Sequence, residues 1–333
     1  MKLLFIFTGG TIGSTLNGEY ISADPTKSYS IIKAYGDKFP IDFEYSVIEP
    51  YAELSENNTG ANIRVLSECV LQNINAGYDG IIVTHGTDTL QYSASAVAYA
   101  LGSDTIPVCF VSSNYPIENP LSNALSNLHS AVLFIKNSLG RGVFVPYKNA
   151  TDDCVKVHRA TRLIAGKAFS DEMESVFGVE YGSFDKDYNF NKSEDYTEAR
   201  DEIVPLGVQA LTRKSGGIVW LTPYPGMVYP EIDDTVKCVL LNTYHSGTID
   251  TKSEVAKAFF LGAKKSGVKV YVTGVTGGPA YDSAKAFEEL GITPLKNLSP
   301  VSAYVKLWIA LDSGLNPDSV LNYSLAGDVV PEK

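Results

Sequence analysis

The 333-residue sequence is poor in cysteine, and it lacks the cysteine and histidine patterns of metal sites. Its four cysteines lie far apart without a C-x-x-C pair, at Cys69, Cys109, Cys154 and Cys238. Each lies in or beside an apolar segment, which favours reduced, buried thiols over a disulfide framework. The four histidines also lack the spacing of zinc ligands. We therefore expect no metal site and no other cofactor.

Long hydrophobic runs and positive charge are also scarce. No run approaches the ~20 apolar residues that span a bilayer. The first run, residues 2–7, is interrupted by two glycines and lacks a cleavage site of small residues, so it predicts a buried strand rather than a secretory signal. Because 27 Lys and Arg face 38 Asp and Glu, the net charge is −11, which opposes binding to nucleic acids and anionic membranes. We therefore expect a cytoplasmic protein without nucleic-acid or membrane partners.

The composition, with 44% hydrophobic and 20% charged residues, is that of an ordinary globular protein. At roughly 150 residues per domain, the length predicts about two domains. In the first half, short apolar runs alternate with segments of helical period. The expected strands are 2–7, 42–48, 80–84 and 107–111, and the expected helices are 61–75, 90–101 and 121–136. This alternation favours an α/β fold with a doubly wound sheet of parallel strands joined by right-handed crossovers.

The alternation stops between Ser183 and Glu202, where the chain is polar and acidic with almost no apolar period. Such a stretch predicts an exposed connection. It is followed by expected strands at 217–222, 236–241 and 268–273 and expected helices at 252–266, 283–290 and 300–312. We therefore expect an N-terminal α/β domain at residues 1–182, a linker at 183–211, and a smaller C-terminal α/β domain at 212–333.

Two polar, glycine-containing segments directly follow expected strands. They are T-G-G-T-I-G-S at residues 8–14 and T-H-G-T-D-T at residues 84–89. In open α/β sheets, ligands bind outside the carboxyl ends of the strands, where both segments lie. Their glycines would let the backbone approach a ligand closely, and their hydroxyls offer nucleophiles.

Local chemistry alone leaves several interpretations of these segments open. The first lacks the G-x-G-x-x-G spacing of dinucleotide-binding proteins, and the second lacks the G-K-[ST] of a phosphate-binding loop. The G-x-S-x-G of serine hydrolases is also absent. A nucleotide site, a hydroxyl nucleophile, and plain turns with helix-capping Thr and Asp therefore all remain.

A threonine nucleophile needs a neighbouring group that takes its proton, and lysine can do so where its pKa is lowered. Lys156, in the run C-V-K-V-H at 154–158, lies among apolar residues, which is an unusual place for an exposed lysine. The alternative is a lysine that protects an edge strand from aggregation.

Together, T-G-G-T-I at 8–12 and T-H-G-T-D-T at 84–89 resemble the two signatures of the bacterial-type L-asparaginase/glutaminase family, most closely its cytoplasmic type I branch. Both signatures are intact, in the expected order and at the expected separation. The resemblance covers essentially the whole chain. It implies a larger, flavodoxin-like N-terminal domain that carries the catalytic residues, a linker, and a smaller C-terminal domain.

The resemblance also implies catalytic roles for individual residues. Thr11 matches the family's nucleophile on the N-terminal loop, and Tyr20 matches the tyrosine that orients or activates it. Thr87 matches the second catalytic threonine, which is hydrogen-bonded to the lysine that Lys156 resembles. Asp88 matches the carboxylate that binds the α-amino group of the substrate.

Ser55 matches the serine that contacts the α-carboxylate of the substrate, and three nearby positions depart from the family. S-S-N-Y-P at 112–116 replaces the usual G-A-x-x-P, which makes the Ser113 carbonyl the candidate contact for the leaving amide nitrogen. Glu56 stands where many members have Gln or Ser, and its carboxylate would add charge near the head group of the substrate. Asn123 replaces a frequent Asp.

The function that the resemblance implies is L-asparagine hydrolysis, which releases L-aspartate and ammonia through a covalent acyl-enzyme on threonine. A homodimer or homotetramer is implied too, since residues 242–248 resemble a segment that approaches the site of a neighbouring subunit. The alternatives are a mixed glutaminase-asparaginase and the amidase subunit of a tRNA-dependent amidotransferase. That subunit carries an extra N-terminal domain, which we do not expect here because T-G-G-T-I begins at residue 8. A nucleotide-dependent oxidoreductase would need an acidic residue behind a G-x-G-x-x-G, which is absent.

Overall fold

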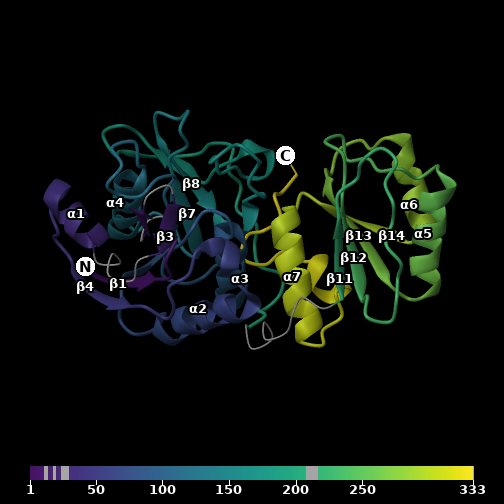
Figure 1. Ribbon diagram of the computed structural model, residues 1–333, viewed down its shortest axis with the longest axis horizontal. Coiled ribbons are helices and arrows are strands. Elements are labelled where there is room, and N and C mark those ends of the chain that lie inside the picture. Colours follow the sequence, from purple (N-terminus) through teal and green to yellow (C-terminus); the bar gives the residue numbers. More distant parts are fainter. Residues whose placement is uncertain (11–13, 18–19, 24–29, 208–216, 333) are drawn as a thin grey trace.

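The computed structural model describes residues 1–10, 14–17, 20–23, 30–207 and 217–332, with the backbone alone at 14–17 and 20–23. An eight-stranded sheet forms the N-terminal part of the molecule, and a four-stranded sheet forms the C-terminal part (Figure 1). A separate antiparallel hairpin joins β2 (Ser14–Asn17) to β3 (Tyr20–Ala23).

Five parallel strands form the centre of the large sheet. In spatial order they are β4 (Glu44–Ile48), β1 (Lys2–Phe7), β5 (Gly80–Thr84), β6 (Val108–Val111) and β7 (Val143–Tyr147). In chain order this arrangement is 2-1-3-4-5, the order of flavodoxin-like sheets, and the direction of winding reverses between β1 and β5. The expected doubly wound α/β fold is confirmed.

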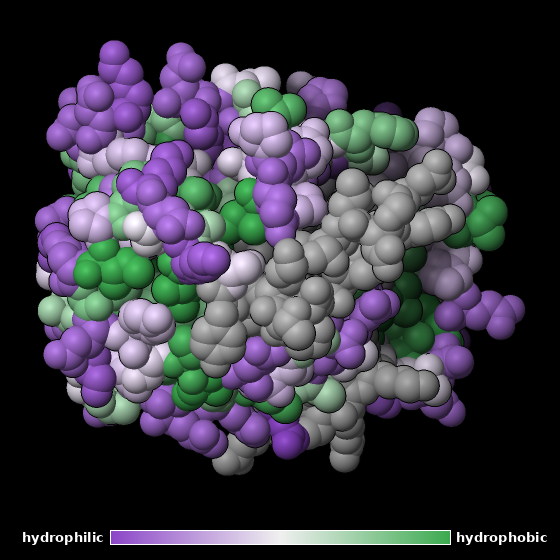
Figure 2. Space-filling view, turned by 60° about the vertical axis from the view of Figure 1, so that its left-hand side comes forward, coloured by the Kyte–Doolittle hydropathy of each residue, from purple (hydrophilic) through white to green (hydrophobic). Residues whose placement is uncertain are grey.

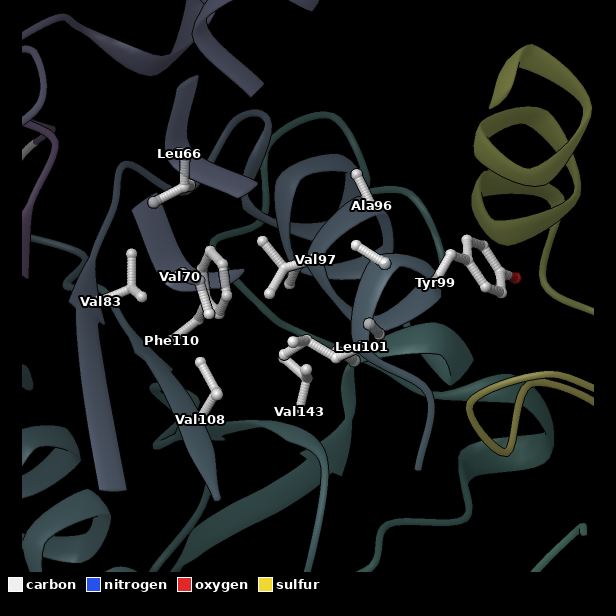
Figure 3. Close-up of a cluster of buried hydrophobic side chains, with 14 of the residues drawn as sticks. Leu66, Val70, Val83, Ala96, Val97, Tyr99, Leu101, Val108, Phe110 and Val143 are labelled. Atoms are coloured by element: carbon white, nitrogen blue, oxygen red, sulfur yellow. The ribbon is translucent and has the colours of Figure 1, made fainter. Parts of the chain in front are cut away.

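Helices cover both faces of this sheet because side chains alternate along each strand. In β1, Leu4 and Ile6 face α2 (Gly60–Asn73) and α3 (Leu90–Leu101), whereas Leu3 and Phe5 face the opposite side. That opposite side is covered by α1 (Ser30–Lys38) and α4 (Ala124–Lys136). Figure 3 shows the α2 and α3 side of the core, where side chains of both helices meet those of β5 and β6. Strands β1, β5, β6 and β7 are therefore buried on both faces, as parallel strands usually are, whereas β4 lies at the edge of the sheet and is partly exposed.

Three antiparallel strands extend the sheet beyond β7: β8 (Val155–Arg159), β9 (Gly182–Phe184) and β10 (Phe190–Lys192). The last two occupy part of the segment for which the sequence predicts an exposed connection. Phe184 and Phe190 lie 5.1 Å apart between ring centroids, and Phe190 also contacts Phe134 of α4. Two aromatic contacts, one of them with a distant helix, thus stabilise strands that the local polar sequence does not indicate.

The C-terminal sheet is wholly parallel, in the order β11 (Ile218–Leu221), β12 (Cys238–Asn242), β13 (Lys269–Val275) and β14 (Ile292–Lys296). One face packs on α5 (Glu254–Lys265) and α6 (Phe287–Leu290). The other face packs on α7 (Pro300–Asp312) and α8 (Asp318–Leu321). The second, smaller α/β unit is confirmed.

Helix α7 lies between the two sheets (Figure 1). Val305 and Ile309 join the core beneath α3, whereas Ala303 and Leu307 pack on the C-terminal sheet. A helix that is apolar on all sides is typical of an element buried between two layers.

A buried ion pair interrupts this apolar helix. Lys306 and Asp328 are both completely inaccessible to solvent, and the ammonium lies 2.6 Å from the carboxylate. The Tyr99 hydroxyl of α3 donates to the same carboxylate at 3.0 Å, and Figure 3 shows this side chain at the end of the core nearest to α7. The Leu325 N–H donates to the other carboxylate oxygen. The pair therefore links the C-terminal turn of the chain to both α7 and α3.

On the face drawn in Figure 2, hydrophobic residues form separate patches among hydrophilic ones. Among the described residues, no helix is both long and apolar enough to cross a membrane.

We expect Lys306→Met to lower the free energy of unfolding by about 3–5 kcal/mol, because it leaves the Asp328 carboxylate buried and unpaired. Equilibrium urea denaturation measures the loss. The control is Lys269→Met, which removes an ion pair of 2.9 Å with Asp318 whose lysine is 55% exposed. This exposed pair should contribute no more than about 1 kcal/mol. Equal losses in the two variants would show that the buried pair has no special role.

Candidate active site

The two glycine-containing segments lie at the carboxyl ends of β1 and β5, where the winding of the large sheet reverses. The Thr8 hydroxyl donates to the Thr84 carbonyl at 2.7 Å, so the two strand ends are joined directly. The backbone of Glu53 accepts from Gly10 and donates to Thr8, both at 3.0 Å. In an open α/β sheet this reversal point is where ligands bind.

Gly10 and Gly86, one from each segment, lie with their backbones in close contact. Gly10 adopts φ +80°, and a Cβ atom there would lie closer than 3.0 Å to the backbone of Gly86. A Cβ atom on Gly86 would in turn clash with the Ser55 side chain. The sequence explains these glycines by the approach of a ligand, but in the structure they permit the close packing of three chain segments. This packing brings the two signatures and Ser55 into one site.

Ser55 and Asp88 form a hydrogen-bonded pair within this site. Ser55 begins a 3₁₀ turn, Ser55–Asn57, and is only 3% exposed. Its hydroxyl donates to the Asp88 carboxylate at 3.0 Å and accepts from the Asp88 N–H at 3.2 Å. Asp88 is exposed, Thr87 beside it is half-buried, and Glu56 is exposed in the same turn as Ser55. The structure thus brings together Ser55, Glu56, Thr87 and Asp88, which lie in two separate stretches of the sequence.

A cavity of about 340 Å³ lies against Thr87 and Asp88. Its other wall is the loop after β8, residues 164–173 apart from 169. The base of this loop is closed by pairing of Leu163 with Ser175. Among the described residues that line the cavity, the one lysine is Lys167, whose ammonium lies 2.6 Å from Glu174. Lys167 is not among the site residues expected from the sequence, although it too has apolar neighbours, in L-I-A-G-K-A-F at 163–169.

Lys156 lies elsewhere, on β8, and does not line the cavity beside Thr87. Its ammonium lies 3.0 Å from Asp152. Burial lowers the pKa of Lys156, but the hydrogen bond and the charge of Asp152, aided by Glu180, outweigh burial and raise it above its ordinary value. A lysine that holds its proton more tightly than usual is a poor proton acceptor.

Ser113 follows β6 directly and is completely buried. The preceding residue is held by α4, because the Asn127 amide donates to the Ser112 carbonyl at 2.9 Å. The residue after Ser113, Asn114, is paired with Asn123. The Asn114 N–H donates to the side-chain oxygen of Asn123 at 2.9 Å, and the Asn123 N–H donates to that of Asn114 at 3.1 Å. The side chain of Asn123 also donates to the Lys148 carbonyl. An aspartate could not make this donation, which accounts for the amide at position 123.

Three further expectations concern the N-terminal loop and residues 242–248. Thr11 lies outside the described residues. Tyr20 begins β3, where its backbone pairs with Asn17. Asn242 accepts from Trp220 at 3.0 Å and donates to Thr222 at 3.0 Å, so its side chain stabilises the C-terminal sheet.

Among the described residues, no group of three or more His, Cys, Asp or Glu side chains could hold a metal ion.

We expect Gly86→Ala to lower the free energy of unfolding by about 1–3 kcal/mol, because the added methyl group overpacks the contact with Ser55. Gly262→Ala is the control. Gly262 lies exposed in α5 with no atom within 4 Å of an added Cβ, and alanine there should be neutral or stabilise the helix by about 1 kcal/mol. Thermal and urea unfolding of both variants measure the difference. Wild-type stability of Gly86→Ala would show that the contact tolerates a side chain.

The family model described as "Asparaginase, N-terminal" matches residues 2–184, more than half of the chain. A glutamyl-tRNA(Gln) amidotransferase subunit from Haloquadratum walsbyi is 28% identical over 97% of this chain and 74% of its own. The thermostable L-asparaginase from Thermococcus kodakarensis has a TM-score of 0.76 at 19% identity, with 100% of both chains covered. A probable cytoplasmic L-asparaginase from Campylobacter jejuni has a TM-score of 0.72 at 22% identity, over 96% of this chain and 98% of its own. The resemblance carried by the two signatures is confirmed, and the chain belongs to the asparaginase family.

Proposed function

We propose that the protein is an L-asparagine amidohydrolase that releases L-aspartate and ammonia. The observation that carries the proposal is the Ser55–Asp88 pair at the reversal point of the sheet. An exposed carboxylate suits the α-ammonium of an amino acid, and the adjacent hydroxyl can turn its one proton from Asp88 to the α-carboxylate of a bound substrate. A substrate held by these two groups extends its side-chain amide towards a fixed place, which is what positioning contributes to catalysis.

The reaction proposed for this site has two steps. The Thr11 hydroxyl, oriented by Tyr20, attacks the amide carbon of the side chain while a base takes its proton. The C–N bond then breaks, the nitrogen leaves as ammonia with that proton, and water hydrolyses the resulting ester to aspartate. The Ser113 carbonyl accepts a hydrogen bond from the amide nitrogen before it leaves, and Glu56 adds negative charge near the ammonium of the substrate.

We propose Lys167, rather than Lys156, as the lysine that works with Thr87. Lys167 lines the same cavity as Thr87 and Asp88, and its side chain is 60% exposed. Both ammonium groups are ion-paired, Lys167 with Glu174 and Lys156 with Asp152, and the pKa of Lys156 is raised. A base must lie within reach of the proton that it abstracts, so position favours Lys167 before acidity is considered.

A second candidate function follows from the relative in Haloquadratum walsbyi, which is a subunit of a glutamyl-tRNA(Gln) amidotransferase. In that case this chain would release ammonia for a partner subunit that acts on a charged tRNA, and the expectation of no nucleic-acid partner would be wrong. In the first case we propose a cytoplasmic homodimer or homotetramer that needs no partner.

Ammonia release from asparagine by the purified protein alone tests the first function. We expect ammonia from wild-type protein, more slowly from glutamine, and a loss of several orders of magnitude in kcat for Thr11→Ala. Thr11→Ser is the matched variant, since it keeps a hydroxyl and should retain measurable activity. No ammonia from either amide without a partner would favour the amidotransferase. More than about a tenth of wild-type kcat in Thr11→Ala would remove Thr11 from the nucleophile role.

The two lysines can be compared directly by the same substitution. Lys167→Met should lower kcat by about 10²–10⁴-fold, the usual contribution of a positioned acid or base. Lys156→Met should keep kcat within a few-fold of wild type, because its ammonium is paired with Asp152 away from the cavity. The reverse result would restore Lys156 as the catalytic lysine.

A further inference from the structure

His85 is completely buried at the carboxyl end of β5, and both of its ring nitrogens have partners. Nδ1 lies 2.8 Å from the carbonyl oxygen of Gly86, and Nε2 lies 3.2 Å from the side-chain nitrogen of Asn58. A carbonyl oxygen only accepts hydrogen bonds, so Nδ1 carries the proton. Burial lowers the pKa of His85 to about 4, against the raising effects of the Gly86 carbonyl and the Asp88 charge. At neutral pH the ring is therefore neutral, and Nε2 is an acceptor.

This tautomer fixes the orientation of Asn58, which must present its NH₂ group to Nε2. The same nitrogen lies 3.3 Å from the Thr89 hydroxyl, and that hydroxyl donates to the Ser55 carbonyl at 2.8 Å. Because the Thr89 hydroxyl gives its proton to the Ser55 carbonyl, the hydroxyl oxygen of Thr89 must accept from Asn58. Both ends of the chain of hydrogen bonds thus require the same orientation of the Asn58 amide.

The chain of hydrogen bonds ends at the proposed binding pair. Thr89 holds the backbone of Ser55, and the Ser55 hydroxyl both donates to and accepts from Asp88. Neither Asn58 nor His85 lines the cavity beside Thr87 and Asp88. Any effect that they have on a ligand there is therefore indirect, and these hydrogen bonds lead to Ser55 and Asp88.

We propose that Asn58 and His85 are positioning residues, which set the separation of Ser55 and Asp88 and thereby the affinity for the head group of an α-amino acid. The proposal rests on the proposed function of Ser55 and Asp88. Asn58 is suited to this role because its amide nitrogen carries two protons, one for each acceptor, and the side chain is uncharged. A buried group deprived of its partner costs free energy, so changes to this chain of hydrogen bonds should move the turn that carries Ser55.

Asn58→Asp tests the proposal, because aspartate has the same shape but can donate to neither His85 nor Thr89. At neutral pH we expect KM for asparagine to rise about tenfold with a smaller change in kcat, the cost of leaving buried polar groups unpaired. As the pH falls, a protonated His85 can donate from Nε2 to the new carboxylate, so KM should recover towards that of wild type. Among the described groups, Asp88 is the charged one that acts on His85, and it is present in both proteins.

Asn62→Asp is the matched control, with the same change of charge nearby in α2. The Asn62 side-chain oxygen accepts from the N–H and the hydroxyl of Thr59 at 3.0 and 2.6 Å, and aspartate can accept both. Its KM and pH profile should follow wild type. An unchanged KM in Asn58→Asp, or a pH profile parallel to that of the control, would overturn the proposal.

The tautomer of His85 can be read without any substrate from the ¹⁵N chemical shifts of its ring. We expect a proton on Nδ1 in wild type and protonation of both nitrogens at a higher pH in Asn58→Asp. A proton on Nε2 in wild type would overturn the proposed chain of hydrogen bonds from His85 through Asn58, whether or not the protein hydrolyses asparagine. If the expected tautomer is found in a protein that releases no ammonia, the chain of hydrogen bonds would be supported, and only the proposed function would be contradicted.

Discussion

The candidate site depends on the contact between the backbones of Gly10 and Gly86. Ordinary side chains keep neighbouring loops apart, and here their absence lets the ends of β1 and β5 meet Ser55 directly. Gly9 and Gly10 also adopt positive φ angles, which other residues rarely adopt. Two sequence signatures that are far apart in the chain therefore become one surface, with the hydroxyl of Ser55 against the carboxylate of Asp88.

The regular core of the fold could be predicted from the sequence because its pattern is local. The strand at 80–84 and the helices at 90–101 and 300–312 have the expected bounds. Strands β9 and β10 were not expected, since short polar segments become strands only through pairing with a neighbour and aromatic contacts with α4. Ser55 and Asp88 were both candidates from the sequence, Asp88 within its signature and Ser55 by its match to the family, and their binding role stays a proposal. Their hydrogen bonds could not be predicted, because these depend on the packing of Gly86 against Ser55.

The proposed exchange of Lys156 for Lys167 shows what a local sequence pattern leaves out. A lysine among apolar residues suggests a perturbed pKa, and Lys156 fits that pattern in the sequence. In the structure this lysine lies beside Asp152, and the pairing outweighs burial. Lys167 also has apolar neighbours in the sequence, and it lies on the cavity because the loop between Leu163 and Ser175 folds back towards α3. Contacts of this kind depend on how the loop closes, and the hydrophobic periodicity of the sequence does not predict that.

Helix α3 connects the site to the C-terminal part of the molecule. Its N-cap residue, Thr89, holds the backbone of Ser55, and Tyr99 near its other end donates to the buried carboxylate of Asp328. The helix is about 18 Å long at 1.5 Å per residue, and it is buried along nearly its whole length. A close-packed helix moves as a unit, so a shift of the C-terminal turn would be transmitted to Thr89. The Lys306–Asp328 pair opposes that shift, because separating two buried charges costs far more than separating exposed ones. The Lys306–Asp328 pair and the Ser55–Asp88 pair thus lie at opposite ends of one buried helix.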